Sequence, residues 1–416
     1  MRFLHIFWFF FLVILIGCSQ GKSTKNTENE GKENTKVLPN YGNINLHEIF
    51  SPYDSYLPNR PQIVHDIDSF YKKVWEKGNL SGGILVAKGS DILYEKYRGF
   101  ARENDSIAID NKTPMHVASV SKPLTTVAIL KLVEAGKIQL DEPLTKIFPK
   151  FPYPKITIEM MLQHRSGLPR YEYFLEKADV PEEHFINNQF ILDFMIKNKP
   201  ELALEPDTGF MYSNTNFALL ALVVEKITQT PFPKAMEEMV FRPLKMDHTY
   251  VFQEKDIPTA SQSFFWQGRK LYPLNYLDLI CGDKNVYTTP RDLYNFSKAL
   301  YSKKFLNPEL KELIFKPYSN EHPGINNYGL GFRMKIFDNG EKLTYHTGWW
   351  HGSNAVFAHL LKSKVTIVAI GNVFSGSLYS TLALSGLFED FPMERAQLEN
   401  ILNINVQDEN FEYLAE

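Results

Sequence analysis

Apolar positions between residues 61 and 76 recur at helical spacing, which predicts an amphipathic helix there. The residues that share its apolar face are Ile63, Ile67, Phe70, Tyr71 and Val74. Two short runs rich in β-forming residues follow, SGGILVAKGS and DILYEKYRGF, and they meet around Gly89-Ser90-Asp91. Strand, turn and strand in this order predict a β-hairpin.

The most apolar helix that the pattern predicts begins near Ser119 and ends before Gly136, a residue type that often terminates helices. Between Leu124 and Ala135 only four positions are polar, so this helix is apolar on nearly all sides. A helix of this kind is buried. Pro123 is tolerated because it falls in the first turn. We therefore expect Ser119 at the start of a central helix, next to the core.

From about residue 140 to residue 320 the pattern is mainly helical, with many loops. Strand character returns in LGFRMKIFD, KLTYHTG, SNAVFAHLL and KVTIVAIGN, and a further helix is predicted at about 376–389. This order of elements predicts an α+β fold. We expect an antiparallel β-sheet flanked by helices, with an inserted helical domain at about 140–320.

The N-terminal residues 1–17 carry one Arg and then an apolar run too short for a membrane span, which is typical of a secretory signal. The run closes in Leu15-Ile16-Gly17-Cys18, which looks like a bacterial lipoprotein signal whose cleavage leaves Cys18 lipidated. An uncleaved N-terminal anchor is the alternative. Both interpretations place the protein in the cell envelope, anchored to a membrane and facing outside the cytoplasm.

Residues 18–45 are polar, and they hold too little apolar surface to fold, so we expect a flexible tether. Residues 46–390 then form the folded domain, and residues 391–416 form an acidic C-terminal tail. The net charge of −3 and the lack of a basic stripe argue against a nucleic-acid partner. Cys281 is the only cysteine besides Cys18, which excludes a disulfide framework and favours a small buried residue.

Ser-x-x-Lys, a spacing that can pair a nucleophile with a base, occurs three times. Ser19–Lys22 lies in the tether, which offers no pocket, and Ser69–Lys72 lies in polar surroundings within the predicted amphipathic helix. Ser119–Lys122 lies at the predicted start of the buried helix, where positions three apart share a face. A serine hydroxyl needs an adjacent base to act as a nucleophile. Burial and the positive end of the helix both disfavour the charge of a lysine, as a base role requires.

Tyr-Ser-Asn offers the second part of a proton relay. It occurs at 212–214, after a turn-like PDTG and before an apolar helix, and at 318–320 in a polar loop that we interpret as surface. A looser match, YGN at 41–43, lies near the end of the tether. A nearby ammonium would favour the ionised form of Tyr212. Asn214 can donate to a substrate carbonyl and can also hold the lysine.

His346-Thr347-Gly348 is the only [His/Lys]-Thr-Gly in the chain, and it ends a predicted strand. Gly348 lets a substrate backbone approach closely. The amide of Trp349 can point into the site, and with the amide of Ser119 it would form an oxyanion hole for a tetrahedral intermediate. Taken alone, the motif is equally compatible with a simple turn.

In this order, the three motifs resemble the Ser-x-x-Lys, Tyr-x-Asn and [Lys/His]-x-Gly signature of serine hydrolases related to β-lactamases and penicillin-binding proteins. The likeness is greatest to the group of class C β-lactamases, D-alanyl-D-alanine carboxypeptidases, D-aminopeptidases and esterases. It covers roughly residues 60–390 and extends to HVASVSKPLTT, LTKIFPKFPYPKITIEMMLQHRSGLP, FRPLKMDHTYVF and GDKNVYTTPRDLYNFSKAL. The resemblance implies that Ser119 is the acylated nucleophile and that Lys122 and Tyr212 share the base and acid roles. Asn214 would assist them.

The chain departs from the usual β-lactamase pattern at His346, where β-lactamases and carboxypeptidases usually carry Lys. The resemblance implies that this side chain and Trp349 contact the substrate and that the amides of Ser119 and Trp349 hold the oxyanion. Histidine is mostly neutral near pH 7, so the fixed charge that faces a substrate carboxylate is missing. The bulky side chains of Trp349, Trp350 and His351 predict a narrower or more aromatic pocket.

These features favour a lipid-anchored serine hydrolase that cleaves an amide or ester bond through a Ser119 acyl-enzyme, of the esterase, amidase or D-peptidase type. A β-lactamase or D-Ala-D-Ala carboxypeptidase proper is one alternative, and a non-catalytic cell-wall or peptide-binding lipoprotein is another. The expected partners are a small-molecule or peptide substrate and, through the lipid, a membrane. No cofactor is expected, and no metal either, because the histidines are scattered and HExxH is absent. The folded domain has no G-x-S-x-G elbow, which argues against an α/β-hydrolase. His164 and Ser166 are expected to brace a turn.

Overall fold

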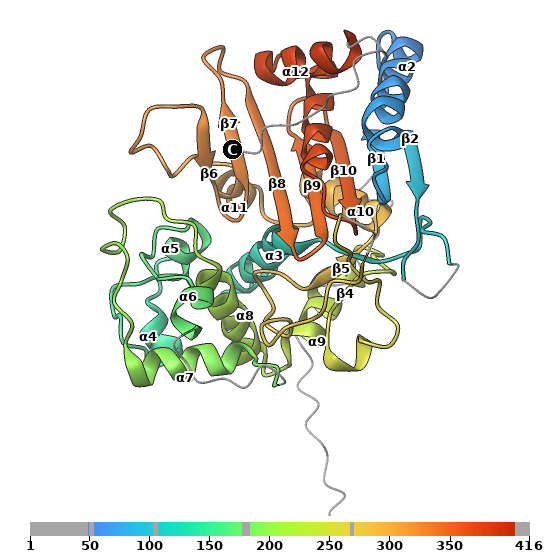
Figure 1. Cartoon of the computed structure of the whole chain (residues 1–416). Helices are drawn as coiled ribbons and strands as arrows, with labels where there is room; N and C mark the ends of the chain where they lie inside the picture. The colour runs from blue at the N-terminus through green and yellow to red at the C-terminus, as the bar shows by residue number, and fades with distance from the viewer. Residues whose placement is uncertain (1–48, 50–53, 103–106, 177–183, 267–269, 404–416) are drawn as a thin grey trace, which may run out of the picture. The chain divides into compact units, whose positions relative to one another are not determined.

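A seven-stranded antiparallel β-sheet organises the computed structural model (Figure 1), in the spatial order β2-β1-β10-β9-β8-β7-β6. Its strands are β1 Gly82–Lys88, β2 Asp91–Arg98, β6 Asn326–Tyr328, β7 Arg333–Ile336, β8 Lys342–Trp350, β9 Ser353–Leu360 and β10 Val365–Gly371. Every neighbouring pair in this sheet is antiparallel. The predicted hairpin and the four predicted C-terminal strands are confirmed.

The structure describes residues 49, 54–102, 107–176, 184–266 and 270–403. They fall within one compact unit, Leu38–Glu416. The predicted signal, the lipidation site Cys18 and the tether lie outside the described residues. None of the described helices is long and apolar enough to cross a membrane.

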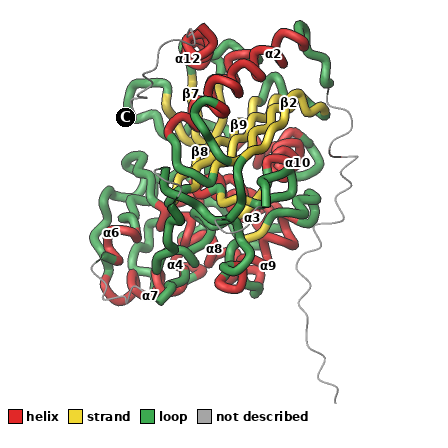
Figure 2. Tube along the Cα trace, turned by 45° about the vertical axis from the view of Figure 1, so that its right-hand side comes forward, coloured by secondary structure: helices red, strands yellow, loops and turns green. Residues whose placement is uncertain are grey.

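The sheet is buried on both faces because its side chains alternate between two cores. On β10, Val368 and Ile370 belong to one core, whereas Ile367 and Ala369 belong to the other. The predicted fold class, an antiparallel sheet flanked by helices, is therefore confirmed (Figure 2).

The first core contains α3, Ser121–Glu134, which is buried along nearly its whole length, as its apolar pattern predicts. The α-helix begins two residues later than Ser119. Ser119 itself lies in a 3₁₀ turn, Ala118–Val120, that precedes α3. The nucleophile candidate therefore sits in a tight turn rather than in the helix.

The section from about 140 to 320 is mainly helical, as predicted. Its helices are α4 Leu144–Ile147, α5 Ile158–Leu162, α6 Tyr171–Leu175, α7 Asn188–Asn198, α8 Asn214–Thr228, α9 Phe232–Met236, α10 Pro290–Tyr301 and α11 Pro308–Ile314. A small sheet of β3 Met115–His116, β5 Val286–Thr288 and β4 Tyr250–Val251 was not predicted. Strands of two or three residues are too short to leave a recurring apolar pattern.

The second core lies under α2, Arg60–Phe70, and α12, Pro392–Asn403. The helix predicted at about 376–389 is present as a 3₁₀ helix, Gly376–Leu387. Helix α12 begins inside the segment that we expected to be a tail, and its Leu398 and Ile401 are buried in this core. Residues 392–403 are therefore part of the folded domain.

Candidate active site

Ser119 is partly exposed, whereas its neighbours Ala118 and Val120 are buried. Ala118 adopts a left-handed backbone conformation with φ of 47°, which is unfavourable for a residue with a Cβ atom. A hydrogen bond of 3.0 Å from the Val117 amide to the Val286 carbonyl ties the turn to β5. The turn thus holds one accessible hydroxyl on a rigid, strained backbone.

Lys122 is fully buried and its amine is surrounded by three oxygen atoms. Its Nζ lies 2.9 Å from Ser119 Oγ and donates to Asn214 Oδ1 and to the Asp283 carbonyl oxygen, each at 2.8 Å. These contacts match the three hydrogens of an ammonium group. If the amine is neutral, the Asn214 and Asp283 bonds use its two hydrogens, and its lone pair faces Ser119 Oγ.

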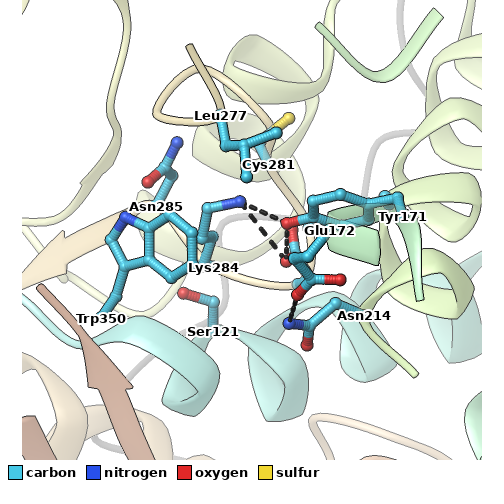
Figure 3. A network of polar contacts seen from close by, with 12 residues as sticks. Ser121, Tyr171, Glu172, Asn214, Leu277, Cys281, Lys284, Asn285 and Trp350 are labelled. Carbon is cyan, nitrogen blue, oxygen red and sulfur yellow. Dashed lines mark hydrogen bonds and ion pairs between the residues drawn. The ribbon is translucent and has the colours of Figure 1, made fainter. Parts of the chain in front are cut away.

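The orientation of Asn214 is fixed from its other side. Its Nδ2 donates to Glu172 Oε1 (Figure 3). Its Oδ1 is therefore the atom that faces Lys122. Glu172 lies in α6, a short helix far from the motif in sequence. Sequence reasoning missed this residue because no spacing links it to Asn214.

A second buried lysine stabilises the loop that offers the Asp283 carbonyl. Tyr171 donates to Asp283 Oδ2 at 2.7 Å and accepts from Lys284 Nζ at 2.5 Å. The ring of Trp350 lies 4.6 Å from the same ammonium (Figure 3). Burial, together with the charge of Asp283, raises the pKa of Tyr171 well above its usual value, so its phenol keeps its proton. This network was also missed, because the acceptor that it positions belongs to the backbone.

Tyr212 presents the face of its ring to the catalytic candidates. The Lys122 ammonium lies 5.0 Å from its ring centroid, and the imidazole of His164 lies 4.2 Å from it. Within the described residues, no hydrogen bond joins the Tyr212 hydroxyl to Ser119 or Lys122. The structure therefore brings Tyr212 to the site but not into a closed relay.

His346 is fully buried rather than exposed toward a substrate. Its Nδ1 lies 2.7 Å from the Thr347 carbonyl, which can only accept, so Nδ1 carries the proton. Its Nε2 then accepts from the Tyr328 hydroxyl at 3.1 Å. Burial, with smaller effects from the charges of Arg333 and Lys122, lowers the pKa of His346 well below its usual value. The imidazole is neutral, and it does not line the open substrate side as we expected.

Gly348 lies inside β8, which continues to Trp350, so the motif does not end the strand. A Cβ atom on Gly348 would lie 2.1 Å from the Val117 carbonyl oxygen and 3.2 Å from the Ala118 Cβ. The glycine thus lets β8 pack against the turn of Ser119, rather than admitting a substrate backbone as predicted. The following residue, Trp349, has a side chain that is 65% exposed.

His164 and Ser166 brace the segment that carries the Tyr-Ser-Asn motif. The Ser213 amide donates to His164 Nδ1 at 3.2 Å, and Ser166 Oγ donates to Asn216 Oδ1 at 2.5 Å. Burial, then the charge of Lys122, lowers the pKa of His164 well below its usual value. These contacts agree with the bracing role expected for both residues.

The competing copies that the structure describes, Ser69–Lys72 and Tyr318-Ser319-Asn320, lie outside this cluster, whereas Ser19–Lys22 and YGN at 41–43 fall outside the described residues. Lys72 pairs with Asp68 at 2.7 Å on an exposed helix face, and Tyr318 bonds the Leu313 carbonyl at 3.2 Å. Burial also raises the pKa of the Cys281 thiol well above its usual value, which disfavours a reactive thiolate. Of the two Ser-x-x-Lys copies among the described residues, the Ser119–Lys122 copy is the one that meets a Tyr-Ser-Asn copy.

Aromatic side chains gather beyond Trp349. A cavity of about 550 Å³ is lined by Phe264, Phe265, Trp266, Lys270, Tyr272, Trp349, His351 and Phe374. His351 is held there by Asp278, with Nε2 2.9 Å from Oδ1. Burial raises the pKa of Asp278, but the hydrogen bonds from His351 and Trp350 outweigh it and lower the pKa below its usual value. The expected aromatic surroundings of the HTGWW segment are thus present.

The fold and the Ser-Lys pair define a serine hydrolase of the β-lactamase type, and comparison with known proteins agrees. A family model described as Beta-lactamase matches residues 67–382, so the chain belongs to the β-lactamase family. Penicillin-binding protein 4* of Bacillus subtilis (strain 168) is 28% identical over 322 residues, which cover 74% of this chain and 71% of that protein. Protein flp of Staphylococcus aureus (strain MW2) is 24% identical over 334 residues, which cover 74% of this chain and 63% of that protein.

Solved structures show the same fold. A penicillin binding protein from Bacillus halodurans is 27% identical with a TM-score of 0.67, covering 80% of this chain and 100% of that one. D-amino acid amidase from Ochrobactrum anthropi SV3, complexed with L-phenylalanine amide, is 21% identical with a TM-score of 0.63, covering 81% of this chain and 98% of that one. The family resemblance expected from the motifs is confirmed.

Proposed function

We propose that this protein is an envelope-anchored hydrolase that cleaves an amide or ester bond through an acyl-enzyme on Ser119. The hydrogen bond of 2.9 Å between Lys122 Nζ and Ser119 Oγ carries the proposal. It holds a base candidate against a partly exposed hydroxyl, which is the arrangement that activates a serine.

In acylation, Ser119 Oγ bonds to the substrate carbonyl carbon, and its proton passes to the Lys122–Tyr212 pair. The carbonyl π electrons move to oxygen, and the amides of Ser119 and Trp349 stabilise this oxyanion. The intermediate collapses when the bond to the leaving nitrogen or oxygen breaks, and the pair returns the proton to that atom. Water then attacks the acyl-enzyme by the same steps, and the proton returns to Ser119.

Tyr212 takes part once a substrate is bound. Its ring already lies against Lys122, and hydrogen bonds in substrate-free sites often close only in the complex. Asn214 keeps the lysine in place during this step through its bond of 2.8 Å.

The substrate that we infer does not depend on a carboxylate bound at position 346. His346 is neutral and buried, so it offers no charge to such a group. The aromatic cavity beyond Trp349 suits an apolar or aromatic substituent instead. Esterase, amidase or D-peptidase activity therefore fits the site best.

The similarity to penicillin-binding protein 4* favours a second candidate, a β-lactamase or D-Ala-D-Ala carboxypeptidase. Both candidates use the same Ser119 chemistry, and they differ in whether the enzyme binds a carboxylate of the substrate.

The apolar run that closes at Gly17-Cys18 supports a lipid anchor. Labelled fatty acid would be incorporated into the wild-type protein, and Cys18→Ala would abolish this incorporation.

A substrate panel on the detergent-solubilised full chain tests the proposal. It contains short-chain esters, D-amino-acid amides, a D-Ala-D-Ala peptide and a chromogenic cephalosporin. We expect the highest kcat/KM on an ester or amide, total loss in Ser119→Ala, and wild-type rates in Ser69→Ala. Rapid cephalosporin hydrolysis would favour the second candidate, and turnover that survives in Ser119→Ala would refute both.

A further inference from the structure

Arg333 is a cation without a carboxylate partner beside the proposed proton relay. Its guanidinium carbon lies 4.9 Å from the ring centroid of Tyr212. The side chain is half-buried at the start of β7, and its Nε is shielded from solvent without a hydrogen-bond partner. In the part of the chain that the structure describes, no ion pair neutralises it.

An arginine in this state is costly, because a shielded guanidinium nitrogen normally finds an acceptor. The two carboxylates of the site do not pair with Arg333 in the described structure; each accepts one hydrogen bond from another group, and Glu172 Oε2 and Asp283 Oδ1 have no partner there. Glu172 accepts from Asn214, and Asp283 accepts from Tyr171. The charge of Arg333 is therefore left to act on the phenol ring that it covers.

The groups that face the Tyr212 ring come from several elements. They are Lys122 of α3, Arg333 of β7, His164 after α5, Tyr328 of β6 and His346 of β8. Arg170 contacts the main-chain carbonyl of Tyr212 at 3.1 Å rather than its ring. No carboxylate belongs to this set of described contacts.

The other three members of the set are neutral. Burial lowers the pKa of His164 and His346 well below the usual value for histidine. Burial raises the pKa of Tyr328 well above the usual value for tyrosine. The described groups that face the ring of Tyr212 therefore include one permanent cation, Arg333, and one group that can be a cation, Lys122. They include no anion.

We propose that Arg333 is a positioning residue that acts through Tyr212. Its guanidinium provides, next to the Lys122–Tyr212 pair, the fixed positive charge that the neutral His346 does not provide. The inference rests on the proposed function, because the relay matters only if Ser119 is acylated. A guanidinium remains charged at any pH at which the protein is folded. Its field favours a phenolate at Tyr212 and disfavours a protonated amine at Lys122.

Both effects have the same sign. Whichever group of the pair loses the proton, it does so at a lower pH when Arg333 is present. Removal of the charge should move the acidic limb of the pH–rate profile to higher pH, by about one pH unit or more. Arg333→Lys keeps the charge and should largely restore the limb, whereas Arg333→Met should not.

The experiment measures the second-order rate at which a fluorophosphonate labels the full chain, as a function of pH. Lys316→Met is the matched control, because the Lys316 ammonium lies 5.4 Å from the ring of Tyr318 in the second Tyr-Ser-Asn copy. We expect the shift in Arg333→Met only. A rate that falls equally at all pH values, with the limb unchanged, would show a structural role and overturn the proposal. KM is also compared in wild type and Arg333→Met for substrates with and without a carboxylate. A rise in KM confined to the carboxylate substrates would show that Arg333 binds the substrate, and it would overturn the proposal too.

A second readout separates this inference from the proposed function. The ultraviolet absorbance of phenolate is titrated in wild type and Arg333→Met, each with and without Tyr212→Phe. The difference between the titrations with and without Tyr212→Phe reports the phenolate of Tyr212. This phenolate should form at higher pH in Arg333→Met than in the protein that keeps Arg333. This holds even if Ser119 proves not to be labelled, and an unchanged titration contradicts the inference. Arg333→Gln replaces Arg333→Met if the latter does not give a cooperative thermal transition.

Discussion

Burial of the Lys122 amine requires that hydrogen bonds replace its water. Ser119 Oγ, Asn214 Oδ1 and the Asp283 carbonyl provide them. Two of these acceptors are fixed by neighbours, Asn214 by Glu172 and the Asp283 loop by Tyr171. The third, the Ser119 hydroxyl, is the one that can exchange a proton with the amine.

Glu172→Ala tests this arrangement. Without the carboxylate, the Asn214 amide can turn its NH₂ group toward Lys122, and the acceptor at 2.8 Å is lost. We expect labelling of Ser119 to slow roughly tenfold, the value of one or two hydrogen bonds. Glu176→Ala, an exposed residue just beyond the same helix, is the control and should label like wild type. Equal rates in all three proteins would contradict the account.

The motif residues of the site could be predicted from the sequence because spacing and context distinguish them from their copies. Ser119, Lys122 and Asn214 meet as expected. Glu172, Asp283 and Arg333 could not be predicted in the same way. Each reaches the site through a tertiary contact, and Asp283 contributes a backbone oxygen that any residue would offer.

Among the elements, β8 and the turn before α3 set the site geometry. Gly348 and the Val117 carbonyl are so close that only a residue without a Cβ fits between strand and turn. This contact fixes where β8 passes the turn, and Trp349 is the next residue along the strand.

Gly348→Ala should push the strand away from the turn. Its Cβ would lie 2.1 Å from a carbonyl oxygen, so we expect a loss of about 1–3 kcal/mol in the free energy of unfolding. Labelling of Ser119 should fall at least tenfold, because the Trp349 amide moves with the strand. Gly376→Ala, where nothing lies within 4 Å, should change neither quantity. Urea unfolding and labelling rates check both.

The aromatic cavity predicts substrate preference. Trp266 is 52% exposed and lines the cavity without belonging to the catalytic set. Trp266→Ala should raise KM about tenfold for esters or amides with an aromatic substituent, because it removes ring contacts, and should leave acetyl esters unchanged. Tyr56→Ala, 74% exposed and outside the cavity lining, is the control. An equal change for both substrates would show that the cavity does not bind the substituent.

The apolar pattern predicted the long periodic elements of the fold, because the residues that are buried in these elements give the sequence its apolar period. Helix α3 and strands β7 to β10 are examples. The pattern failed where local chemistry decides. The 3₁₀ turn at Ala118–Val120 and the short strands β3 to β5 carry no period. The acidic composition of residues 391–416 as a whole obscured the few buried positions of α12.

At the scale of the whole molecule, four histidines among the described residues are buried in the neutral form. They are His116, His164, His346 and His359. Burial lowers the pKa of His116 and His359 to about 3, and it lowers the pKa of the other two well below the usual value. As the pH falls below about 6.5, the unfolded chain binds protons that the folded chain refuses.

Stability should therefore decrease on acidification, from about pH 6.5 toward pH 3. Each of these histidines contributes about 1.4 kcal/mol per pH unit to that loss. Urea midpoints measured between pH 7 and pH 5 give the slope. His359→Gln should reduce it by the share of one proton, and the exposed His65→Gln should leave it unchanged. A slope that is the same in His359→Gln as in wild type would contradict the assignment of His359 as a buried, neutral histidine.

Covalent trapping tests the central claim most directly. The full chain is treated with a fluorophosphonate, and the modified residue is located by mass spectrometry of the digested protein. The account predicts one adduct per chain, on the peptide that contains Ser119, present in Ser69→Ala and absent from Ser119→Ala. An adduct on any other residue, or equal labelling of Ser119→Ala, would contradict it.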